Sequence, residues 1–162
     1  MNTAIYPGTF DPITYGHIDV IKKSLNVFDR LVVATTDNIN KNYYFSIEDR
    51  LKIINNSLFK DLKLSPKKIK VISFDNLTIH LCRKYKANTI IRGLRAVSDF
   101  EYEFQLAGMN KKLNHKIDTM FLMSDVENQI ISSKFVKEIA SLGGNIERFV
   151  TRSTVKMLKN KI

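Results

Sequence analysis

The sequence predicts an α/β fold in which a five-stranded parallel sheet is doubly wound, with helices on both faces. Short apolar runs with the length of a buried strand recur along the chain, and stretches with helical spacing of apolar residues lie between them. Strand and helix therefore alternate, and right-handed crossovers usually join adjacent parallel strands. We expect strands at Thr3–Tyr6, Leu31–Thr35, Ile69–Ser73, Thr89–Arg92 and Asp118–Leu122.

Apolar stripes and terminal patterns locate the helices between these strands. One stripe comprises Ile18, Ile21, Leu25 and Phe28, and a second comprises Leu51, Ile54 and Leu58. Ser46 and Ser98 each precede an acidic residue by three positions, which is the pattern of a helix N-terminal capping box. The final third is expected to add two helices, at Ser132–Leu142 and Thr151–Lys161.

Length and composition indicate one domain spanning residues 1–162. The chain is 44% hydrophobic, which is enough to bury a core without disulfides. No apolar run approaches the ~18–20 residues needed to cross a bilayer, and the first residues do not resemble a signal peptide. We therefore expect a cytoplasmic protein with no membrane partner, and we expect the single Cys82 to fill a helix face in the core.

The formal net charge of +10 indicates an anionic partner, which could be nucleic acid, a membrane surface or a polyanionic small molecule. A basic nucleic-acid-binding module is one hypothesis. It is disfavoured because the aromatic residues are not interleaved with the basic cluster as a stacking platform requires. Phe10, Phe45, Phe100, Phe104 and Phe121 instead fit the predicted structural patterns.

Three unusual stretches directly follow predicted strands. They are "PGTFDPITYGH" (Pro7–His17), "RGLR" (Arg92–Arg95) and "NQIISSK" (Asn128–Lys134). In parallel α/β sheets, ligands bind outside the carboxyl ends of the strands, near the point where strand order reverses. We therefore expect the functional site to form from these loops.

The first stretch has the features of an anion site at a helix N-terminus. Pro7-Gly8 and Pro12 make the loop rigid. Thr14 and His17 project to the same side if the helix begins near Thr14, and Gly16 leaves backbone N–H groups open to a ligand. A tight strand-to-helix turn without a ligand is the structural alternative.

Gly8–Pro12 followed by Thr14–His17 resembles the (T/H)xGH signature of the nucleotidyltransferase superfamily, which has a Rossmann-like fold. Within it, the chain looks like the phosphopantetheine adenylyltransferase family, because "IIRGLRAVSDFEYEFQLAGMN" and "FLMSDVENQIISSKFVKEIA" are similar to family segments. The resemblance implies transfer of the adenylyl group of ATP to 4'-phosphopantetheine, giving dephospho-CoA and pyrophosphate. It also implies Mg²⁺ bound with ATP, recognition of dephospho-CoA or CoA, and a homohexamer. No zinc-like Cys/His pattern is present, and no protein metal site is expected.

The resemblance assigns roles to individual residues. The catalytic residues would be His17, Lys41 and Arg92. The acceptor would be bound by Thr9, Lys41, Leu77, Thr78 and Arg92. ATP would be bound by Thr9, Phe10, His17, Gly93, Leu94, Arg95, Glu103, Asn128, Gln129, Ile130, Ile131, Ser132, Ser133 and Lys134.

Some positions depart from the family pattern. Asn128 replaces a common aromatic residue, Lys134 replaces a small hydroxyl residue, and Thr78 replaces an apolar one. Asn42 and Tyr43 follow Lys41 where the family has Lys-Pro. These changes affect the segment Asn128–Lys134, which the resemblance implies would close over ATP as a lid, and the pocket for the pantetheine arm. Another nucleotidyltransferase with a different acceptor is the main alternative, and the "RGLRAVSDFEYE" segment argues against it.

Overall fold

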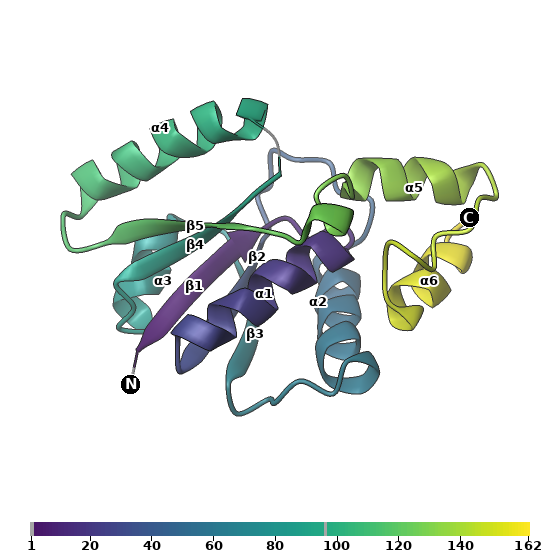
Figure 1. The fold of residues 1–162 in the computed structure, drawn as a ribbon, viewed down its shortest axis with the longest axis horizontal. Helices are drawn as coiled ribbons and strands as arrows, with labels where there is room; N and C mark the ends of the chain where they lie inside the picture. Colours follow the sequence, from purple (N-terminus) through teal and green to yellow (C-terminus); the bar gives the residue numbers. More distant parts are fainter. Residues whose placement is uncertain (1, 96) are drawn as a thin grey trace.

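A computed structural model describes residues 2–95 and 97–162, except the side chains of Val97 and Ser98. The five strands form one sheet in the order β3-β2-β1-β4-β5, and every neighbouring pair is parallel (Figure 1). The strand bounds are Thr3–Gly8 for β1, Arg30–Thr36 for β2, Ile69–Phe74 for β3, Thr89–Leu94 for β4 and Asp118–Met123 for β5. All five predicted strands are confirmed, and each extends slightly beyond its predicted bounds.

The helices follow the predicted alternation. Their bounds are Tyr15–Val27 for α1, Ile47–Asn55 for α2, Thr78–Lys84 for α3, Val97–Leu113 for α4, Ser133–Ser141 for α5 and Arg152–Lys159 for α6. A π-helical turn, η1 (Asn56–Asp61), extends α2, and a 3₁₀ turn, η2 (Val126–Asn128), precedes α5. Ser46 caps α2 as predicted, because its hydroxyl accepts the Asp49 N–H at 3.1 Å. The predicted cap at Ser98 lies outside the described side chains.

The core lies on both faces of the sheet. Helices α1 and α2 pack against the face that carries Leu31 and Val33, with α6 beyond α2. Helix α3 packs against the opposite face, which carries Val32 and Ile90. Cys82 belongs to this second cluster and is 1% exposed, so its predicted place in the core is confirmed. Helices on both faces confirm the doubly wound arrangement.

Helix α4 lies along the outside of the sheet over β4 and β5, and it exposes apolar side chains (Figure 1). Phe100 and Phe104 are 45% and 64% exposed, so neither side chain is part of the core. The Phe100 ring does contact Phe121 of β5, with ring centroids 5.8 Å apart. A straight helix lying on two strands can bury only one side, and the apolar residues of α4 are not confined to that side. No described helix is both long and apolar enough to cross a membrane.

The strand order reverses between β1 and β4. The chain builds outward from β1 to β2 and β3, and then returns to place β4 on the other side of β1. Within the described residues, β1 and β4 pair over two residues each, Ala4–Ile5 with Thr89–Ile90, whereas β1 and β2 pair over six. The carboxyl-terminal halves of β1 and β4 are therefore free to flank a ligand at the switch point.

Candidate active site

A cavity of about 570 Å³ opens at the carboxyl ends of the strands. The three stretches singled out in the sequence converge on it, although they lie far apart in the chain. The predicted site residues that line it are Thr9, Phe10, His17, Lys41, Arg92, Gly93, Leu94, Arg95, Glu103, Ile131, Ser132, Ser133 and Lys134.

Five predicted binding residues do not line this cavity in the described structure. Leu77 and Thr78 lie at the start of α3, and Leu77 is 51% exposed. Asn128 instead donates its amide to Asp19 of α1 at 2.7 Å, and Gln129 donates to the Ser124 carbonyl. Ile130 is exposed. Their assignment to ATP or acceptor stays a prediction.

His17 lies in the first turn of α1, where Thr14 is the N-cap residue. The Thr14 N–H donates to Nδ1 of His17 at 3.1 Å, and the Thr14 hydroxyl lies 3.0 Å from the same nitrogen. A backbone N–H can only donate, so Nδ1 accepts and a neutral ring carries its proton on Nε2. Burial, and secondarily the charges of Arg95 and Arg92, lowers the pKa of His17 to about 4. Among the described residues, no hydrogen bond involves Nε2, so the cavity contains a neutral imidazole whose Nε2–H can donate to a ligand.

Gly16 has a packing role in the structure, and it also lines the cavity, where its contact with a ligand stays a prediction. A Cβ atom on Gly16 would lie 3.1 Å from the Asn128 carbonyl oxygen and 3.7 Å from that of Ile131. The missing side chain therefore allows the Asn128–Ile131 segment to approach the start of α1 closely. The sequence did not indicate this contact, because the partner segment lies more than 100 residues away in the chain.

Arg92, at the end of β4, is held by its neighbours. Its Nε donates to Glu103 Oε2 at 2.6 Å, its Nη2 donates to the other carboxylate oxygen, and its Nη1 donates to the Pro7 carbonyl at 2.9 Å. Burial opposes the charge on Arg92, but the contacts with Glu103 outweigh it and raise the pKa of the guanidinium. Glu103 was predicted at the nucleotide; in the structure it is 7% exposed and orients Arg92 across the gap between β4 and β1.

The segment Asn128–Lys134, which is predicted to close over ATP, is anchored at several points. The Ser132 hydroxyl caps α5 by accepting the Phe135 N–H at 3.1 Å. The Ser133 hydroxyl donates to the Pro12 carbonyl at 2.7 Å, which joins α5 to the loop after β1. Arg95 lies 3.5 Å from both the Ile131 carbonyl and the Asp99 carboxylate, so it remains weakly held at the cavity rim. It is therefore available to a phosphate.

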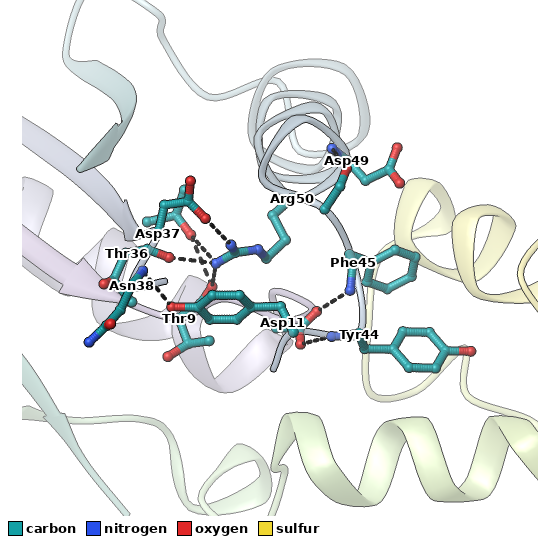
Figure 2. A network of polar contacts seen from close by, with 12 residues as sticks. Thr9, Asp11, Thr36, Asp37, Asn38, Tyr44, Phe45, Asp49 and Arg50 are labelled. Atoms are coloured by element: carbon teal, nitrogen blue, oxygen red, sulfur yellow. Dashed lines mark hydrogen bonds and ion pairs between the residues drawn. The ribbon is translucent and has the colours of Figure 1, made fainter. Parts of the chain in front are cut away.

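Sequence reasoning missed several residues that shape the cavity. Asp11, Tyr43 and Lys137 all line it. Asp11 is 5% exposed and accepts the backbone N–H groups of Tyr44 and Phe45 at 2.7 and 2.9 Å, as Figure 2 shows. The Asp–Pro pair inside the first motif was the available signal for Asp11. Nothing in the spacing pointed to Lys137, which reaches Asp11 from α5 at 3.4 Å.

Among the described residues, no group of three or more His, Cys, Asp and Glu side chains is placed to hold a metal ion. The buried carboxylates at the cavity already have partners, since Glu103 faces Arg92 and Asp11 faces two amides. The donors available to a ligand are cations, hydroxyls and N–H groups. The cavity is therefore suited to a polyanion.

Fold and site together define a nucleotidyltransferase of the cytidylyltransferase-like class, whose family model matches residues 5–139. The fold is similar to that of Plasmodium falciparum nicotinic acid mononucleotide adenylyltransferase (TM-score 0.70, 17% identity, 99% of this chain and 95% of that chain). It is also similar to a bifunctional NMN adenylyltransferase/ADP ribose pyrophosphatase from Francisella tularensis (TM-score 0.73, 13% identity, 98% and 48%).

Sequence relatives narrow this class further. The chain is 65% identical to the phosphopantetheine adenylyltransferase of Pelagibacter ubique, over 98% of this chain and 96% of that protein. It is 46% identical to the protein of the same name from Roseobacter denitrificans, over 100% and 98%. The chain therefore belongs to the phosphopantetheine adenylyltransferase family, which confirms the resemblance.

Proposed function

We propose that this protein transfers the adenylyl group of ATP to 4'-phosphopantetheine, with dephospho-CoA and pyrophosphate as products. The observation that carries the proposal is full-length similarity to phosphopantetheine adenylyltransferases, combined with a cavity that brings the motif residues together. In the reaction, an oxygen of the acceptor phosphate forms a bond to the α-phosphorus of ATP. The bond from that phosphorus to the oxygen bridging to the β-phosphorus breaks, and pyrophosphate leaves.

This chemistry requires alignment and charge stabilisation rather than a protein nucleophile, because the acceptor phosphate is itself the nucleophile. His17 donates its Nε2 proton as a hydrogen bond to the phosphates of ATP, where charge develops in the transition state. Lys41 and Arg92 hold the acceptor phosphate, with Thr9 between the two substrates. Gly93, Leu94 and Arg95 line the side of the cavity that binds ATP, together with residues 131–134.

Mg²⁺ is proposed to arrive with ATP. The ion prefers oxygen ligands in octahedral geometry, retains several waters, and is commonly held by substrate phosphates with one or two carboxylates. The buried carboxylates Asp11 and Glu103 already accept strong hydrogen bonds. The phosphates and water would therefore supply most of the ligands, and the ion would neutralise charge on the departing pyrophosphate.

We further propose a single catalytic domain that assembles as a homohexamer, and a cytoplasmic location stays a prediction. Exposed apolar residues along α4 support self-association, because solvated apolar side chains on one helix are typical of an interface. They are Phe100, Tyr102, Phe104, Met109 and Leu113. Size-exclusion chromatography with light scattering tests the assembly, and a monomer at micromolar concentration would contradict it.

The proposed activity is tested by incubating the protein with ATP, Mg²⁺ and 4'-phosphopantetheine and detecting dephospho-CoA by mass spectrometry. Parallel reactions offer nicotinamide mononucleotide as acceptor and CTP as donor, and pyrophosphate release is measured in each. Dephospho-CoA formation at the highest kcat/KM supports the proposal. Faster turnover of another pair would favour a different nucleotidyltransferase, and tight DNA binding at ~0.15 M salt without turnover would favour the nucleic-acid hypothesis.

A further inference from the structure

A buried arginine lies behind the cavity without lining it. Arg50 projects from α2 and is 0% exposed, and its guanidinium faces the segment Asp37–Phe45, which we call the Lys41 loop. The loop follows β2 and leads into the N-cap of α2. Lys41 itself is exposed, so its position depends on how the rest of the loop is held.

The Arg50 guanidinium contacts two backbone carbonyls and one carboxylate at once (Figure 2). Its Nη1 donates to the Thr36 carbonyl at 2.7 Å and lies 3.1 Å from the Thr9 carbonyl. Its Nη2 lies 3.3 Å from the Asp37 carboxylate at the start of the loop. One side chain thereby joins the Lys41 loop to the loop after β1, which carries Thr9.

Tyr43 and Asp11 fix the other half of the Lys41 loop. The Tyr43 ring stacks under Arg50, with its centroid 3.8 Å from the guanidinium carbon, and its hydroxyl accepts the Asn38 N–H at 2.9 Å. Beyond Tyr43, Asp11 accepts the N–H groups of Tyr44 and Phe45. The loop is therefore tied at its start, near its middle and at its end, and only the turn that carries Lys41 is left in solvent.

Stability alone does not account for this arginine. A buried charge loses its hydration, and a buried ion pair frequently contributes no net stability. Within the described residues, Arg50 Nε has no hydrogen-bond partner, and the Asp37 side chain is 47% exposed, which weakens the pair. A planar guanidinium can donate in its plane and stack on an aromatic face at the same time, which a lysine ammonium cannot do. We therefore attribute to Arg50 a role in fixing the geometry of the Lys41 loop rather than in stabilising the fold.

We propose that Arg50 is a positioning residue for adenylyl transfer, which acts by fixing the Lys41 loop so that Lys41 meets the phosphate of the acceptor. The inference rests on the proposed function for the identity of the acceptor. Arg50 touches neither substrate. Its effect therefore passes through Lys41 and falls on the acceptor more than on ATP.

A double-mutant cycle between Arg50→Lys and Lys41→Ala tests this coupling. The measured quantities are kcat/KM for 4'-phosphopantetheine at saturating ATP and the dissociation constant of ATP. In the Lys41 background, Arg50→Lys should lower kcat/KM for the acceptor about tenfold, the worth of one charge-assisted hydrogen bond. In the Lys41→Ala background, the same change should cost less than twofold, with ATP binding changed less than threefold throughout.

Ser46→Ala is the matched stability control. It removes the N-terminal cap of the same helix and should lower the urea midpoint of unfolding, while leaving kcat/KM for the acceptor unchanged. If Arg50→Lys does not fold by circular dichroism, Tyr43→Leu removes the stack and takes its place in the cycle under the same criteria. The proposal would be overturned if Arg50→Lys lowered kcat/KM for the acceptor by the same factor with Lys41 present and in the Lys41→Ala background. It would also be overturned if ATP binding weakened by the same factor as kcat/KM for the acceptor. Failure of the wild type to form dephospho-CoA would refute the proposed function instead.

Discussion

The half-buried, neutral His17 makes the stability of the protein depend on pH in a defined window. The pKa of this side chain is about 4 in the folded protein and 6.5 in the unfolded chain. Between these pH values the unfolded chain binds a proton that the folded protein does not. The free energy of unfolding therefore increases as pH rises through this window and decreases as pH falls through it. We predict that replacing His17 by a side chain that does not titrate removes this dependence.

The size of the effect follows from the two pKa values. The contribution of His17 is small at pH 7, and proton linkage gives a loss of about 2 kcal/mol by pH 5. The loss saturates near 3 kcal/mol below pH 4. Carboxylates elsewhere in the protein also titrate in this range, so the relevant quantity is the difference between the wild type and a His17 variant.

Urea unfolding of the wild type and His17→Asn at pH 7 and pH 5 measures this difference. The wild type should lose about 2 kcal/mol more than the variant on acidification. His80→Asn, which changes an exposed histidine, serves as the control and should behave like the wild type. Equal losses in the wild type and His17→Asn would refute the assignment of a neutral imidazole with a lowered pKa.

Three further predictions concern the site and the core. His17→Ala should lower kcat at least 100-fold while the fold is retained, because its donor acts on developing charge; a near-normal kcat in steady-state assays would contradict this role. Arg92→Ala should weaken binding of 4'-phosphopantetheine about tenfold or more and ATP binding much less, and calorimetry showing the reverse order would reject the assignment. Cys82 is buried, and burial raises the pKa of its thiol to about 11; it should react with a thiol reagent at pH 8 only after urea unfolding, and fast labelling of the native protein would argue against its place in the core.

The convergence of the predicted loops on one cavity has a simple origin. Pro7–His17, Arg92–Arg95 and Asn128–Lys134 each lie at or beyond the carboxyl end of a strand, and parallel strands place these ends on one edge of the sheet. The strands themselves were recognisable as short apolar runs between helical patterns. The convergence of these three loops on one cavity therefore followed from local sequence patterns and one rule of topology.

Contacts between segments that are distant in the chain could not be predicted from local sequence patterns. The pairing of Arg92 with Glu103 depends on how α4 lies over β4, and Phe100 and Phe104 remain exposed because only one side of that helix meets the sheet. The close approach of Asn128 to Gly16 likewise depends on tertiary packing. None of these contacts has a signature in residue spacing.

The sequence by itself determined the strand and helix order, the family and the loops that line the cavity, because these depend on local patterns and on motif residues close together in the chain. The tertiary structure alone decided the protonation state of His17, the partner of Arg92 and the tie from Arg50 to the Lys41 loop. These properties depend on burial and on donor–acceptor distances between residues remote in sequence, and they exist only once the chain has folded.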